Sequence, residues 1–141
     1  MLRRCLLLAL PLLLLLPLGC QKAGPVVAQV SGRIMIDDGK TKKPLAGARI
    51  IFEPLDKGPD GKPLPPSQAD TDAEGAYKLT LTGDRGSEGA VVGPHTVRIS
   101  LIERGNRLTN KIPDRYNTHS DLRYTVPPDG STDADFQVRT R

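Results

Sequence analysis

Hydrophobic and polar residues alternate along most of the chain after its first two dozen positions. Successive side chains of a β-strand point to opposite faces, so this alternation is typical of strands buried on one face. The pattern predicts seven strands, over residues 26–36, 48–53, 67–71, 77–81, 96–101, 122–126 and 134–138. No segment has the period of an amphipathic helix.

Clusters of Gly, Pro and Asp separate these strands and predict turns and loops. The strands at 67–71 and 77–81 are expected to form a β-hairpin, because only a short turn joins them. A proline-rich loop is expected over 54–66, a second loop over 83–93, and an irregular polar segment over 104–120. The sequence therefore predicts an all-β fold, an antiparallel β-sandwich that forms one domain over residues 26–141.

The first twenty residues follow a different pattern. Arg3 and Arg4 precede an apolar run over residues 6–18, which only Pro11 and Pro17 interrupt among otherwise hydrophobic positions. This order of charge and apolar residues predicts a signal peptide over residues 1–19. A permanent transmembrane helix is the alternative, but such a helix needs about 20 apolar residues and this run is shorter.

The end of this leader, Leu16-Pro17-Leu18-Gly19-Cys20, resembles the lipobox of bacterial lipoproteins. In that motif a small residue precedes a cysteine that receives diacylglycerol and becomes the new N-terminus. Gly19 and Cys20 match the motif, whereas Pro17 stands where the family usually has leucine. The resemblance implies a lipid on Cys20, with residues 20–25 as the lipidated cysteine and a short tether. An ordinary secretory leader with an incidental cysteine is the alternative.

Cysteine usage agrees with lipidation. Cys5 lies in the leader, so Cys20 is the only cysteine left after cleavage and has no partner for a disulfide within the chain. The expected location is a cell membrane, with the protein lipid-anchored and facing the periplasm or the cell surface. By resemblance to proteobacterial sorting, Gln21 after the cysteine favours the outer over the inner membrane. The membrane, reached through the N-terminal lipid, is thus a predicted partner.

Composition limits the other partners. The net charge is +4, but Arg3 and Arg4 lie in the leader, so the remaining chain is close to neutral and its basic residues are scattered among acids. Nucleic acid is therefore not an expected partner. The chain has no Trp, and three Tyr and two Phe are its only aromatic residues. Flat aromatic platforms for bases or sugar rings are accordingly scarce.

Three segments together resemble the carboxypeptidase regulatory-like domains: Val30-Ser31-Gly32-Arg33-Ile34, Lys43-Pro44-Leu45-Ala46-Gly47-Ala48-Arg49-Ile50 and Thr71-Asp72-Ala73-Glu74-Gly75-Ala76-Tyr77-Lys78-Leu79. They occur in the family's order, and the resemblance covers about residues 26–103. It implies a seven-stranded transthyretin-like sandwich, close in form to the immunoglobulin-like sandwich, that acts as an accessory module without catalysis. The continuation over 112–126 is similar to small lipoproteins abundant in planctomycetes.

Two patterns suggest metal sites and fall short of them. Asp70, Asp72, Glu74 and Gly75 have the spacing that opens a calcium loop, but the twelfth position is Leu81 where the loop needs Glu, so a hairpin turn is expected there. His95 and His119 are the only histidines, and no retained thiol accompanies them. The sequence predicts no metal site and no cofactor.

Catalysis is not expected either. The chain has no Gly-x-Ser-x-Gly elbow to present a nucleophile. Transthyretin-like hydrolases of the hydroxyisourate type end in Tyr-Arg-Gly-Ser, whereas this chain ends Gln137-Val138-Arg139-Thr140-Arg141. A hydrolase that uses His95 or His119 is the enzymatic alternative.

Partner contact is the remaining functional question. Arg115, Tyr116 and Asn117 lie in the polar segment 104–120 and are the candidates for contact with an envelope protein or a glycan. The alternative for this segment is a solvated loop with a packed Tyr116. The predicted function is a non-enzymatic, lipid-anchored envelope protein with an accessory or binding domain. A carbohydrate-binding module is the second hypothesis, and it would need exposed aromatic side chains, for which only Tyr116 and Tyr124 are available.

Overall fold

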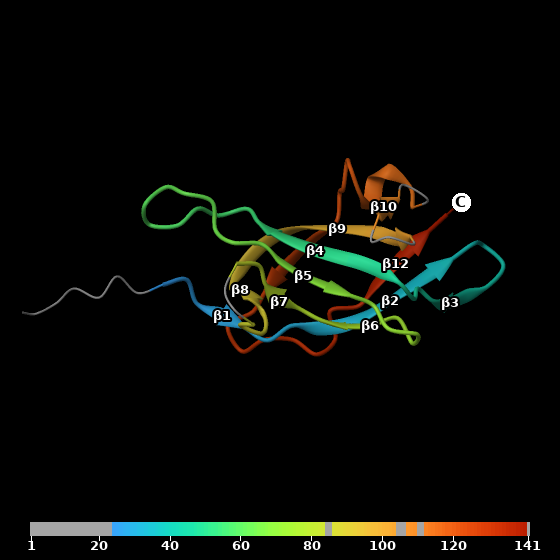
Figure 1. Cartoon of the computed structure of the whole chain (residues 1–141), viewed down its shortest axis with the longest axis horizontal. Helices are drawn as coiled ribbons and strands as arrows, with labels where there is room; N and C mark the ends of the chain where they lie inside the picture. Colours follow the sequence, from blue (N-terminus) through green and yellow to red (C-terminus); the bar gives the residue numbers. More distant parts are fainter. Residues whose placement is uncertain (1–23, 84–85, 104–106, 110–111, 141) are drawn as a thin grey trace, which may run out of the picture.

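The computed structural model describes residues 24–83, 86–103, 107–109 and 112–140. These ranges consist mostly of β-strands, with a single 3₁₀ turn, η1 (Asp114–Tyr116), and no α-helix among them. The predicted all-β class is thereby confirmed. Figure 1 shows the long strands β4 (Ala48–Pro54) and β9 (Gly93–Glu103) running side by side through the middle of the molecule.

The larger sheet is built around β9. Its order is β10-β9-β4-β5-β7, and β11 pairs with the opposite end of β9 from β10. Besides β4 and β9, this sheet contains β5 (Ser67–Asp70), β7 (Thr80–Leu81), β10 (Arg107–Thr109) and β11 (Arg123–Val126). All its pairs are antiparallel.

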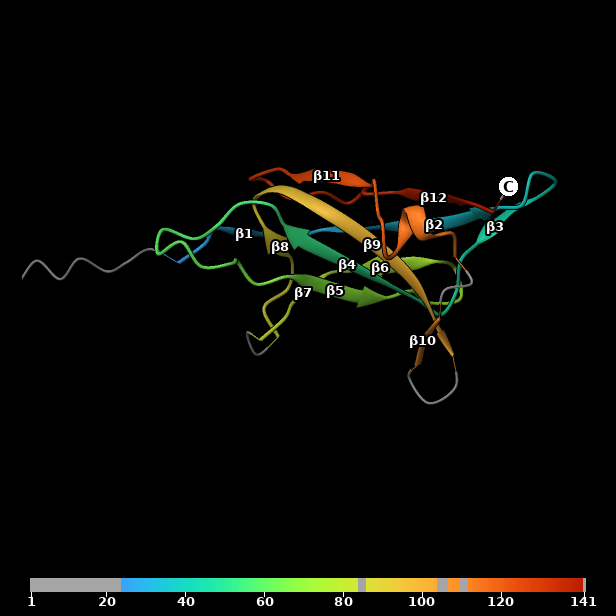
Figure 2. The same ribbon diagram turned by 90° about the horizontal axis from the view of Figure 1, so that it is seen from above.

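The smaller sheet is built around β2 (Ser31–Asp37). Its other members are β3 (Lys42–Pro44), β6 (Ala76–Lys78) and β12 (Phe136–Arg139), each of which pairs with β2. A separate two-stranded pair joins β1 (Val27–Ala28) to β8 (Ala90–Val91). Figure 2 shows β12, β2 and β3 together along one side of the molecule.

The pairing of β12 with β2 is parallel, which differs from the wholly antiparallel sheet expected from the sequence. The cause lies in the chain before β12. From Ser131 onward this segment already runs alongside β2 in the same direction, since Ser31 N–H donates to Ser131 O (2.9 Å) and Ala134 N–H donates to Ser31 O (3.1 Å). The long connection after β11 therefore delivers β12 parallel to its neighbour.

The core draws side chains from both sheets. In β4 the buried residues Ala48, Ile50 and Phe52 alternate with more exposed ones, as the sequence pattern predicts. They pack in one cluster with residues of β2, β9 and β12, among them Ile34, Val97, Ile99 and Val138. Burying each large side chain contributes roughly 1.5–3 kcal/mol, so this continuous cluster is the main source of stability.

The expected hairpin over 67–81 is formed only in part. β5 pairs with β7 through Ser67 and Leu81, but β6 leaves that sheet and pairs with β2. The change of sheet falls at Leu79, which is fully buried and whose N–H donates to Val30 O (2.9 Å). Three short strands, β3, β8 and β10, also lie in segments expected to be turns or loops.

Candidate functional site

The three segments that carry the family resemblance meet in one hydrogen-bond network. Thr71 Oγ1 donates to Leu45 O (2.6 Å) and accepts from Ala48 N–H (2.9 Å), with all three groups buried. Leu45 N–H donates to Ile34 O, and Ile34 N–H donates to Gly75 O, both at 2.9 Å. The motif residues therefore join the two sheets, which is a structural role.

The stretch with the calcium-like spacing forms the predicted turn. Asp72 Oδ1 accepts hydrogen bonds from the N–H groups of Glu74 (3.0 Å) and Ala76 (2.8 Å). Asp70 instead forms an ion pair with Arg49 (2.7 Å), and this bond raises the pKa of the guanidinium. The carboxylates of Asp70 and Asp72 thus bind different partners within the chain: Asp70 binds the Arg49 side chain, and Asp72 binds backbone N–H groups of its own turn.

Arg115 and Tyr116, two of the candidate contact residues, hold the end of β12. Tyr116 is buried, and its hydroxyl accepts from Arg139 N–H (3.1 Å), while Arg115 Nη2 donates to Arg139 O (2.8 Å). The Arg115 guanidinium also lies 5.0 Å from the centre of the Tyr116 ring. Burial raises the pKa of Tyr116, but hydrogen bonds from Arg115 and Arg139 and their charges outweigh it, so the net shift is downward. Asn117 is half-buried beside them.

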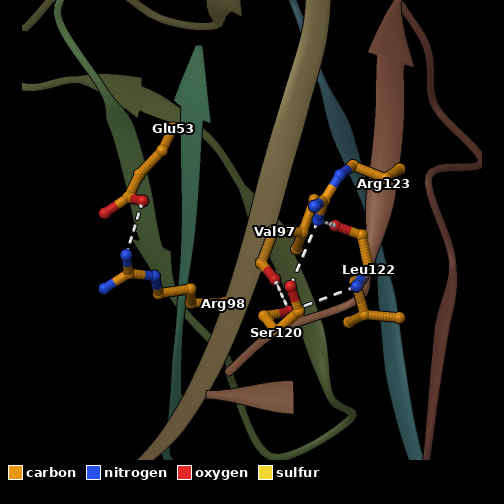
Figure 3. Close-up of polar contacts among 6 residues, drawn as sticks. All are labelled: Glu53, Val97, Arg98, Ser120, Leu122 and Arg123. Atoms are coloured by element: carbon orange, nitrogen blue, oxygen red, sulfur yellow. Dashed lines mark hydrogen bonds and ion pairs between the residues drawn. The ribbon is translucent and has the colours of Figure 1, made fainter. Parts of the chain in front are cut away.

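The end of this loop is fixed to β9 (Figure 3). Ser120 Oγ donates to Val97 O and accepts from Leu122 N–H (3.2 Å). Next to this contact, Arg98 of β9 forms an ion pair with Glu53 of β4 (2.9 Å). Among the three candidate contact residues of this segment, Tyr116 is packed, as the solvated-loop alternative expects. Arg115 is the one of the three whose side chain is exposed to a partner.

Replacing Tyr116 with Phe is expected to lower the free energy of unfolding by about 0.5–1.5 kcal/mol, because the Arg139 amide loses its acceptor. Urea unfolding followed by far-UV circular dichroism measures the change, and His119→Gln, an exposed position in the same loop, serves as the control. If Tyr116→Phe and the control unfold alike, the hydroxyl does not hold β12.

His95 lies in the core, with 1% of its surface exposed. Its Nδ1 lies 2.9 Å from Gly93 O, and the Phe52 ring centre is 5.7 Å from that of His95. Its Nε2 has no hydrogen-bond partner among the described residues. Burial lowers the pKa of His95, although the Gly93 carbonyl and the Asp56 charge act in the opposite direction. His95 is therefore a neutral core side chain at pH 7.

Ser67 and His95 do not form a Ser-His pair of the kind a hydrolase would use. Ser67 Oγ is the other buried side-chain atom without a partner among the described residues. Ser67 lies on β5 and His95 on β9, with β4 between them. Neighbouring strands lie about 4.8 Å apart, so two strand spacings place these residues about 10 Å apart or more, well beyond hydrogen-bond reach. His119 is exposed.

Acid is expected to destabilise the protein through His95. The pKa of His95 is lower in the folded protein than in the unfolded chain, where it is 6.5. Below pH 6.5 the unfolded state therefore binds more protons than the folded state, and the free energy of unfolding decreases as the pH decreases. The loss reaches at most about 1.4 kcal/mol per pH unit and ends at the folded-state pKa. Urea unfolding at a series of pH values measures the slope, which should flatten in His95→Phe and persist in His119→Gln. An unchanged slope in His95→Phe contradicts the assignment.

Aromatic side chains gather inside the molecule. All five lie in the described part of the chain, and none is fully exposed. Phe52, Tyr124 and Phe136 form a mutual cluster with ring centres 5.5–6.0 Å apart. Of the two side chains available to a carbohydrate-binding module, Tyr116 is buried and Tyr124 is half-buried, so neither presents a fully exposed ring on a sheet face.

A polar hollow of about 440 Å³ lies where β2 and β6 meet the chain before β12. Several of its polar groups have partners within the protein. Arg33 N–H donates to Asp135 Oδ1 (2.7 Å), and the Tyr77 hydroxyl donates to Ala134 O (2.5 Å). Burial raises the pKa of Tyr77, so it remains a neutral donor. These hydrogen bonds join β2 and β6 to the chain before β12, so they have a structural role at this hollow.

A second, more apolar groove of about 670 Å³ was not anticipated from the sequence. It lies between the beginning of the described chain, at Gly24 and Pro25, and the proline-rich loop after β4. The one available signal was the pair of leucines, Leu55 and Leu64, within an otherwise polar and proline-rich segment. Sequence alone could not place the chain start against that loop.

The predicted lipidation site, Cys20, lies outside the described residues. Within the described ranges, no helix has the length and apolar character to cross a membrane. No protein-family model, curated protein or solved structure matches the chain.

Proposed function

We propose that this chain is a lipid-anchored envelope protein whose mature part is a non-enzymatic accessory or binding domain. The observation that carries the proposal is the junction Gly19-Cys20, which follows a long apolar leader and supplies the only cysteine outside that leader. Acyl chains on an N-terminal cysteine would anchor the protein firmly, since each buried methylene contributes about 0.8 kcal/mol. The Gln21 that follows favours the outer membrane.

The domain is proposed to be a seven-stranded transthyretin-like sandwich of the carboxypeptidase regulatory-like type. Support comes from the two strand systems that share one core, and from the three motif segments, whose residues bond to one another through Thr71, Leu45 and Ile34. The additional strands β3, β8 and β10 are two or three residues long, so the longer strands carry the proposed framework.

A binding or supporting role is favoured over catalysis by what the polar residues do. His95 is enclosed in the core, Asp72 closes a turn, and Tyr116 holds β12. The exposed Arg115 beside the end of β12 is the candidate contact for an envelope protein. The proposed partners are thus the membrane, through the lipid, and a protein or envelope component that contacts the domain at Arg115.

Membrane extraction tests the anchor. In the native host, high salt is expected to leave the protein in the membrane pellet, whereas a non-ionic detergent releases it, because the anchor is apolar. The Cys20→Ser protein should be absent from the lipid-modified pool that metabolic labelling with palmitate reveals. Release of the wild-type protein by salt alone contradicts the proposal.

A further inference from the structure

The proline-rich loop and the beginning of the described chain occupy the same end of the molecule. Val92 N–H donates to Val26 O, and Leu55 N–H donates to Pro94 O, both at 2.9 Å. Residues 92 and 94 are nearly adjacent, so Val26 and Leu55 are held at one place. In Figures 1 and 2 the loop after β4 and the start of the chain extend from the same end, and the β2–β3 turn lies at the other.

This end carries two exposed large hydrophobic side chains. Val26 is 66% exposed and Leu55 is 53% exposed, and they are the exposed large hydrophobic side chains among the residues whose burial the structure describes. The apolar groove of about 670 Å³ lies between Pro25, which precedes Val26 in the chain, and the loop that contains Leu55. Its apolar lining comes from Gly24, Pro25, Pro59, Pro63, Leu64 and Pro65. We call Val26, Leu55 and this lining the proline-loop face.

Charge on the loop is balanced. The loop carries two acids and two bases, Asp56, Asp60, Lys57 and Lys62. Asp60 and Lys62 form an ion pair (3.5 Å). A neutral loop is not repelled by an anionic surface, and it gains little from one. This end therefore offers a partner an apolar area flanked by charged Asp and Lys side chains, the combination found at the boundary between lipid headgroups and acyl chains.

The position of the lipid sets the distance to the bilayer. Cys20 precedes Gly24 by four residues, and four residues can span at most about 14 Å. A lipid on Cys20 therefore holds the proline-loop face close to the membrane surface at a high effective concentration.

We propose that the proline-loop face is a membrane-docking surface that rests in the headgroup region of the bilayer. The inference depends on the proposed lipid anchor. Docking orients the domain, because Arg115 lies at the opposite end: it bonds to Arg139, which pairs with Asp37 just before the β2–β3 turn. The membrane thus holds one end, and the end with Arg115 faces the compartment, where a protein partner can reach it.

Site-specific fluorescence tests the docking. The lipid-modified mature protein, which begins at Cys20, is reconstituted into vesicles of phosphatidylethanolamine and phosphatidylglycerol, with an environment-sensitive fluorophore on a single introduced cysteine. Leu55→Cys is the test position, and Lys40→Cys, exposed in the β2–β3 turn, is the matched control. The sulfur of Cys20 carries the diacylglyceryl group in such a protein, so the introduced thiol is the reactive one.

Brominated lipids are expected to lower the emission at position 55 roughly twofold while leaving position 40 unchanged, because only the former reaches headgroup depth. Equal emission in brominated and unmodified vesicles at position 55 overturns the docking. A blue-shifted signal there that brominated lipids do not quench also overturns it, since protein then covers the face. The intact mass of the same sample separates the two proposals: an unlipidated protein refutes the anchor, whereas a lipidated protein without quenching refutes only the docking.

Discussion

Replacing Phe52 with Ala is expected to lower the free energy of unfolding by about 3–5 kcal/mol. Phe52 is fully buried on β4, and its ring lies 5.5 Å from that of Tyr124 and 5.9 Å from that of Phe136, measured between centres. Truncation removes the side chain around which the other rings pack, and it leaves a cavity that the two sheets close only in part. A single domain is typically stable by about 5–15 kcal/mol, so this loss is a large fraction of the total.

Urea unfolding followed by far-UV circular dichroism measures this effect, since the chain has no Trp to report by fluorescence. Leu55→Ala is the matched control, because Leu55 follows β4 directly and is 53% exposed. The control should change stability by less than about 0.5 kcal/mol. Similar losses in the two variants would mean that the core is not centred on Phe52.

Replacing Gly32 with Ala is expected to destabilise the protein by about 1–3 kcal/mol or more, the cost of overpacking. A Cβ on Gly32 would lie 2.2 Å from the carbonyl oxygen of Ala134, far inside contact distance. The backbone of Gly32 fixes the position of the Cβ, and the carbonyl of Ala134 is itself backbone, so neither atom can turn aside. The segment before β12 would have to move away from β2, and the hydrogen bond from the Tyr77 hydroxyl to Ala134 O would be lost.

The matched control for this variant is Gly24→Ala, where no atom lies within 4 Å of the added Cβ. Thermal unfolding by circular dichroism should show a clear decrease in Tm for Gly32→Ala and almost none for Gly24→Ala. A Gly32→Ala protein as stable as the wild type would show that the crossing of Ala134 over β2 is not as close as described.

The strands that sequence predicts correctly are those with a strict two-residue period and one buried face. β4 is the clearest case, because Ala48, Ile50 and Phe52 all point into the core. Short strands such as β3 and β8 escape prediction, since two or three residues are too few for a period to be recognised. The parallel entry of β12 was also unpredictable, because it depends on contacts between Ser31 and the distant Ser131 and Ala134.

The candidate site was predictable only where chemistry is local. Asp72 and Gly75 mark a turn through neighbours along the chain, and the structure forms it: Gly75 has a φ of +70°, and a Cβ there would lie 2.5 Å from Ile34 O. Tyr116 shows the limit of such reasoning. A Tyr beside an Arg in a polar loop suggests a contact surface, yet its hydroxyl bonds to Arg139, a partner that only the tertiary fold supplies.

The proline-rich segment shows the same limit from the opposite side. Its composition predicts a loop, which the structure forms, but composition does not reveal that the loop lies against Gly24 and Pro25. Adjacency between a loop and the chain start is a property of the folded molecule. Val26 and Leu55 are both exposed, and only their backbone hydrogen bonds to Val92 and Pro94 show that they lie at the same end of the molecule.

The intact mass of the mature protein from its native bacterium, measured beside a Cys20→Ser variant, tests the central claim most directly. Lipid anchoring predicts a chain that begins at Cys20 and carries the added mass of a diacylglycerol, with that addition absent from Cys20→Ser. A wild-type chain that retains the leader, or is cleaved elsewhere and carries no lipid, would contradict the account of a lipid-anchored envelope protein.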